Sequence, residues 1–217
     1  MNEIELIARN QLFPYWIIYA LLFSIAIISI LKYQKEFVFV NLKNAFFRAP
    51  SSVPFSKGEI SFFGATNWIL LINYFAVSGI TVYMLLVYFK VGHSWMVILP
   101  MAYYFYQSFA LFIAGTLSGE LKKLKDLFLL LNFTTHSIGI VMIPILFIWI
   151  LNPELSTYLP KTLTVVFLLF HFIRIVRSIF IALKNKVLWY YIILYLCGLE
   201  IWPILAVYLL VSPGFIG

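Results

Sequence analysis

The sequence has very few charged side chains, and this scarcity excludes a water-soluble domain. Asp, Glu, Lys and Arg together make up 11% of the 217 residues, whereas hydrophobic residues make up 64%. A soluble domain carries about a quarter charged residues, so this chain cannot cover its surface with groups that water solvates. The composition therefore predicts an integral membrane protein.

Cysteine is nearly absent as well. Cys197 is the single thiol, so an internal disulfide is excluded and a thiol-based metal or redox centre has no second ligand. The sequence also contains no glycine-rich phosphate loop, no paired carboxylates and no histidine pair at metal-binding spacing. We therefore expect no enzyme activity, no cofactor and no metal.

A basic leader is missing too, because residues 1–13 hold two acids and one Arg. A cleaved signal peptide begins with a basic region, so we expect the first apolar run to remain as a helix. The net charge of +7 is typical of basic loops that meet anionic lipid headgroups. We expect membrane lipids and other membrane proteins as partners, and no nucleic acid.

What the sequence does contain is a series of apolar runs close to the ~20 residues that a membrane-spanning helix needs. These predict an all-α bundle of about six transmembrane helices, forming a single polytopic membrane domain over residues 1–217. The expected spans are residues 14–31, 67–89, 94–117, 127–151, 162–183 and 188–211.

The distribution of Lys and Arg predicts the orientation of these spans. If the N-terminus lies outside, twelve of the fifteen Lys and Arg residues face the cytoplasm, and three face outward: Arg9, Lys90 and Lys161. This positive-inside bias places both termini outside the cytoplasm. The tryptophans are then expected in interfacial belts, at outer boundaries (Trp16, Trp95, Trp149) and inner ones (Trp68, Trp189).

The longest connection, residues 33–66, is cytoplasmic in this arrangement. Val38, Leu42 and Phe46 fall on one face of a predicted helix, whereas Asn41 and Arg48 fall on another. This pattern favours an amphipathic helix in the headgroup plane, with a docking surface for a cytoplasmic partner as the alternative.

The stretch of residues 170–203 holds the charges that are most expensive in hydrocarbon. His171, Arg174 and Arg177 recur every three residues and so share one helical stripe, while Glu200 is the only acid deep inside an apolar run. His136 is expected at a similar depth, and residues on other spans could contribute: Asn73, Gln107 and Asn132.

Two interpretations of this intramembrane polar cluster remain open. In one, Arg174 pairs with Glu200 and aligns two helices, with His136 hydrogen-bonded nearby. In the other, the cluster is a functional site, either a proton relay or a pocket in which Arg174, Arg177 and His171 hold an anionic headgroup.

Small residues recur in the third predicted span. Gly115 and Gly119 stand four residues apart, and three more small residues follow the same spacing: Ala110, Ala114 and Ser118. This interval lets helix backbones approach closely, so Gly115 and Gly119 are predicted to pack against another helix.

The last third of the chain resembles a known family. The arginine pair Arg174 and Arg177, followed by the stretch YLCGLEIWP at residues 195–203, is similar to domain-of-unknown-function family 4271, small polytopic inner-membrane proteins of Bacteroidota-type bacteria. The resemblance implies a bacterial cytoplasmic (inner) membrane and a multi-pass protein. It implies no biochemical activity.

Three functions are compatible with these features. The first is a structural or assembly subunit of a larger cell-envelope complex, with secretion or motility machinery as candidates. The second is a transporter or anionic-lipid-binding protein that uses the intramembrane cluster. The third, a membrane enzyme acting on a lipid-linked substrate, has the least support because the polar residues lie deep in the spans.

Overall fold

The computed structural model describes residues 13–36, 39–40, 42–43, 64–90, 94–117 and 121–186. This part of the chain is helical throughout and contains no strand, which confirms the predicted all-α class. Two short 3-10 helices, η1 (Ser94–Ile98) and η2 (Pro153–Thr157), join long helices. The long helices are α1 (Trp16–Gln34), α3 (Ala65–Phe89), α4 (Leu99–Leu117), α5 (Leu121–Leu151) and α6 (Leu159–Lys184).

Among the residues that the structure describes, five helices are long and apolar enough to cross a membrane. Their bounds fall within a few residues of the first five predicted spans, because each apolar run ends where polar residues or Gly and Pro begin. The sixth predicted span, residues 188–211, lies outside the described residues, as does Glu200.

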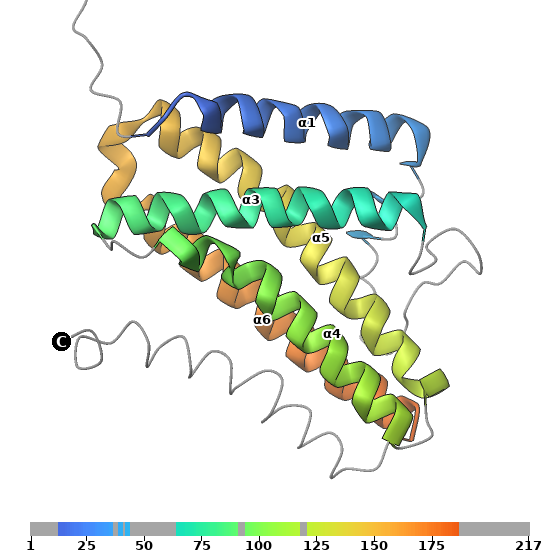
Figure 1. The fold of residues 1–217 in the computed structure, drawn as a ribbon. Coiled ribbons are helices and arrows are strands. Elements are labelled where there is room, and N and C mark those ends of the chain that lie inside the picture. Colours follow the sequence, from blue (N-terminus) through green and yellow to red (C-terminus); the bar gives the residue numbers. More distant parts are fainter. Residues whose placement is uncertain are drawn as a thin grey trace, which may run out of the picture.

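Contacts between helices give the direction in which each span runs (Figure 1). The start of α1 meets the end of α5, α3 runs parallel to α5, and the end of α6 meets the start of α5. α4 runs back along α3. This alternation of direction is what serial crossings of one membrane require. The contacts that define it are Phe13–Trp149, Thr81–Met142, Asn185–Asp126 and Tyr104–Phe75.

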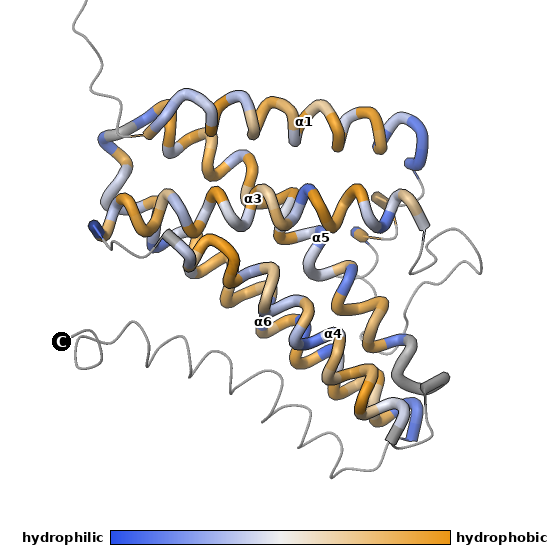
Figure 2. Tube along the Cα trace, viewed as in Figure 1, coloured by the Kyte–Doolittle hydropathy of each residue, from blue (hydrophilic) through white to orange (hydrophobic). Residues whose placement is uncertain are grey.

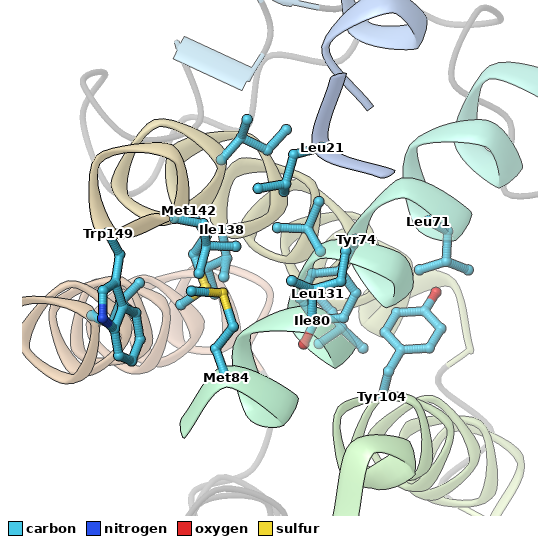
Figure 3. Packing of buried hydrophobic residues seen from close by; sticks show 14 of the residues in the cluster. Leu21, Leu71, Tyr74, Ile80, Met84, Tyr104, Leu131, Ile138, Met142 and Trp149 are labelled. Carbon is cyan, nitrogen blue, oxygen red and sulfur yellow. The ribbon is translucent and has the colours of Figure 1, made fainter. Parts of the chain in front are cut away.

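Helix α5 is the centre of the described bundle, since it contacts α1, α3, α4 and α6. Residues 131–139 of this helix are all buried. Around them the core closes with side chains from α1, α3 and α4, including Leu21, Tyr74 and Tyr104 (Figure 3).

A small residue sets the closest approach of α3 to α5. A Cβ built on Gly139 would lie 3.0 Å from Cα of Tyr74, a backbone atom that cannot move aside. Of the glycines singled out in the sequence, Gly115 is buried on α4, and Gly119 lies outside the described residues.

Apolar residues make up much of α4 and α6 (Figure 2). Many large hydrophobic side chains of the described helices are exposed, which suits lipid as the surrounding solvent. On α4 and α6 they include Phe105, Phe109, Phe112, Leu168, Leu169 and Phe172.

The tryptophan prediction needs one correction. Trp16, Trp68 and Trp95 are exposed, as interfacial residues should be, but Trp149 is only 1% exposed. Its ring makes edge contacts with Phe13 and Tyr88, at centroid distances of 5.5 and 5.9 Å. Trp149 is therefore a core residue, because the segment before α1 and the end of α3 cover this end of α5.

The amphipathic helix predicted for residues 33–66 falls mostly outside the described residues. Leu42 is described, and it is buried in a second hydrophobic cluster with Leu31, Leu70, Leu129 and Phe133. If the spans have the predicted orientation, Leu42 packs against the cytoplasmic end of the bundle.

Candidate functional site

The inward side of α6 carries the three basic side chains that the sequence placed on one stripe. His171, Arg174 and Arg177 are each 4% exposed, although all are costly to bury in hydrocarbon. The helix brings them together because three-residue steps return to nearly the same side of a 3.6-residue turn.

Arg174 reaches from α6 to α4. Its Nη1 donates a hydrogen bond to Oε1 of Gln107 at 3.0 Å, and its Nη2 donates to the Tyr103 hydroxyl at 3.3 Å. Tyr103 and Gln107 lie one turn apart on α4, so a single guanidinium spans both through its planar fork of donors.

His171 completes this group, which we call the Arg174 cluster (Tyr103, Gln107, His171, Arg174). Its Nδ1 lies 3.2 Å from Nη2 of Arg174, and its Nε2 lies 3.4 Å from the Tyr103 hydroxyl. The Nδ1 lone pair faces a donor that cannot accept, so Nδ1 is the acceptor and Nε2 carries the proton. The ring also stacks on Phe167, with 18° between the planes.

The cluster fastens two helices whose backbones come close at few places. Long polar side chains therefore bridge α4 and α6 where small residues do not. Hydrogen bonds to a charged group are worth about 1.5–3 kcal/mol in soluble proteins, and neutral ones between membrane helices average about 0.6 kcal/mol. The predicted Arg174–Glu200 pairing involves a residue beyond the described ranges.

His136 lies in a different polar group, centred on α5. Its Nδ1 is 2.7 Å from the backbone oxygen of Asn132, and the side-chain Oδ1 of Asn132 accepts a 2.6 Å hydrogen bond from the Tyr104 hydroxyl. No described hydrogen bond joins His136 to Arg174 or His171. The structure thus divides the predicted polar residues between an α4–α6 cluster and an α4–α5 group.

Buried hydroxyls on the same helices bond within their own helix. Each donates to the carbonyl oxygen four residues earlier, which satisfies the hydroxyl without a partner helix. These residues are Ser78, Thr81, Thr135 and Ser178.

Within the described residues, no group of three or more His, Cys, Asp or Glu side chains could hold a metal ion. The Arg174 cluster supplies a fixed positive charge and donors, which can orient a helix or hold an anion.

Sequence reasoning named Arg174, His171 and Gln107 but missed their phenol partner, Tyr103. The signal was present, because Tyr103 precedes Gln107 by four residues and so shares its face of α4. Gly139 was also missed, although Thr135, a residue small enough for close helix packing, stands four positions before it.

The described residues define an all-helical protein with five helices long and apolar enough to cross a membrane, and with hydrogen-bonded polar side chains between them. A family model described as domain of unknown function (DUF4271) matches residues 17–211, so the chain belongs to this family. Searches of curated proteins and of solved structures gave no match.

Proposed function

We propose that this protein is a non-enzymatic structural or assembly subunit of a larger cell-envelope complex in the inner membrane of a Bacteroidota-type bacterium. In this proposal six helices span the membrane and both termini face away from the cytoplasm. Secretion and motility machineries are the candidate complexes.

The proposal rests on one observation: polar side chains within the apolar helices form hydrogen bonds to other helices of the same bundle. Arg174 bonds Gln107 and Tyr103 on α4, and Tyr104 on α4 bonds Asn132 on α5. These contacts hold helices of one bundle in a fixed arrangement. A rigid bundle with short connections and an apolar outer surface suits a scaffold that neighbouring membrane proteins pack against.

An anionic-lipid site is the second candidate, and a specific observation favours it. Arg174 and Arg177 lie one turn apart on α6, both are buried, and His171 adjoins them. Two guanidinium groups match the oxygens of a phosphate headgroup. A lipid bound there would have to enter between α6 and a neighbouring helix.

Site-specific photocrosslinking in intact membranes tests the proposal. A photoreactive residue is placed at exposed positions on different helices, Tyr19, Phe109 or Phe172, with buried Leu111 on α4 as the control. We expect discrete protein adducts from one face and none from Leu111. Lipid adducts alone from every exposed position would contradict the subunit role.

A further inference from the structure

Leu42 lies in the connection between α1 and α3, yet the bundle buries it. Its side chain is 6% exposed, whereas that of Val40, two residues earlier, is 46% exposed. Leu42 shares a hydrophobic cluster with side chains of three helices: Leu31, Leu70, Leu129 and Phe133. The connection is therefore held against the helices at Leu42.

The cluster lies where α3 and α5 diverge. These helices approach closely at Tyr74 and Gly139, but they cross obliquely, so that their starts lie apart (Figure 1). Leu70 is in the second turn of α3 and Leu129 is in the third turn of α5, both on the diverging side of the crossing. Protein interiors are close-packed and contain few voids, so a side chain from outside the two helices has to fill the space between them. Leu42 supplies that side chain.

Leu42 fills this space almost completely. The cavity that remains beside it has a volume of about 10 Å³, which is too small for any ligand larger than a water molecule. Three buried polar residues reach the lining of the same cavity, Asn67 from α3 and Asn132 and His136 from α5. Shortening Leu42 would therefore open a space that leads to these polar side chains.

We propose that Leu42 is an apolar plug, which keeps the aqueous phase at this end of the bundle away from the polar side chains between α3 and α5. The plug matters because Asn132 accepts the hydrogen bond from Tyr104 that joins α5 to α4. Water that reached Asn132 would compete for this oxygen, and a hydrogen bond that water can replace contributes little to stability. By excluding water, Leu42 preserves the contact between α4 and α5.

The plug gives the connection a protein contact in place of a lipid contact. The sequence predicts that the face holding Leu42 lies toward lipid, whereas α1, α3 and α5 cover Leu42 in the structure. The plug does not depend on the chain being a complex subunit, since a lipid-binding protein with this bundle would need it equally.

Thiol accessibility of the full chain in lipid nanodiscs tests the plug. Cys197→Ser removes the single native thiol, and Asn67→Cys then places a reporter thiol on the cavity wall that Leu42 also lines. The reagent is a charged methanethiosulfonate, which does not enter lipid. We expect slow modification while Leu42 is present and several-fold faster modification in Leu42→Ala. Equal rates would overturn the proposal.

A matched variant shows whether the effect belongs to the buried position. Val40→Ala shortens an exposed apolar side chain two residues away and should leave the rate at the reporter unchanged. Leu42→Met keeps the buried volume nearly constant, so its rate should also stay slow. Fast modification in either variant would contradict a plug that works by filling the space between α3 and α5.

A second reporter distinguishes a local plug from general loosening of the bundle. Thr81→Cys replaces a buried residue further along α3, whose hydroxyl lies 3.6 Å from Sδ of Met142. In Leu42→Ala this second thiol should stay slow to react while the thiol from Asn67→Cys becomes fast. If both became equally accessible, Leu42 would stabilise the whole bundle and the proposal of a local plug would be wrong.

Discussion

Gly139 on α5 lies directly against the backbone of Tyr74 on α3. A Cβ at Gly139 would be 3.0 Å from Cα and 3.2 Å from Cβ of Tyr74. Because the nearest atom belongs to the backbone, a side chain at this position must push the two helices apart. The close packing of α3 against α5 therefore requires a residue without a Cβ at position 139.

Gly139→Ala should destabilise the folded protein by about 1–3 kcal/mol, the usual range for overpacking a core. Thermal unfolding in detergent, followed by circular dichroism, measures the effect. Gly79→Ala on α3 is the matched control, because its Cβ would meet Val97 Cγ1 at an ordinary 3.4 Å. Equal stability of the two variants would show that α3 and α5 do not meet at Gly139.

Gln107→Leu should lower stability by about 1–2 kcal/mol, because it removes the acceptor that lies 3.0 Å from Nη1 of Arg174. A double-mutant cycle with Arg174→Met measures the coupling between the two residues. Thr116→Val, whose hydroxyl bonds a carbonyl of its own helix, should change stability by less than about 0.5 kcal/mol. A coupling energy near zero would show that Gln107 and Arg174 do not interact, so that α4 and α6 are not joined at this position.

Tyr104→Phe should cost about 1–3 kcal/mol, because it leaves the buried Oδ1 of Asn132 without its donor. Tyr19→Phe, on the exposed side of α1, is the control with the same chemical change. Denaturant titration of both variants gives the comparison. Similar unfolding midpoints would mean that the Tyr104 hydroxyl contributes nothing to the α4–α5 contact.

Trp149→Ala should destabilise the bundle by about 3–5 kcal/mol, the range for removing a large buried side chain. Trp95→Ala removes the same ring from an exposed position and should have a much smaller effect. Expression yield and unfolding temperature distinguish the two. If Trp95→Ala lowered the unfolding temperature more than Trp149→Ala, Trp149 would lie at the membrane–water interface and not in the core.

The helices could be predicted from the sequence because a span must be both long and apolar, and few alternatives satisfy both conditions. The side to which α6 turns its basic stripe was also predictable, since burying His171 and Arg174 in lipid is too costly. The helix that this stripe contacts could not be predicted, because helical periodicity identifies the buried face of a helix but not the neighbour that packs against it. The sequence argument expected Glu200, which lies outside the described residues, and the inter-helix hydrogen bonds that the structure describes for Arg174 reach α4.

Trp149 and Gly139 illustrate the same limit. A tryptophan at the end of an apolar run has the same sequence pattern whether lipid headgroups or other parts of the protein cover it. Here Phe13 and Tyr88 cover Trp149, and both are distant from it in the sequence. Gly139 allows a close approach at a point where the neighbouring helix presents Tyr74 and not another small residue. Both depend on helix order in space, which local sequence does not encode.

The most direct test of the subunit proposal is native mass spectrometry of the tagged chain, released gently from its own membrane. We expect particles heavier than the 25.2 kDa chain by whole protein subunits in a fixed ratio. A particle of one chain that carries only a specific anionic lipid, and loses it when Arg174 and Arg177 are replaced, would contradict the subunit role and establish a lipid-binding protein instead.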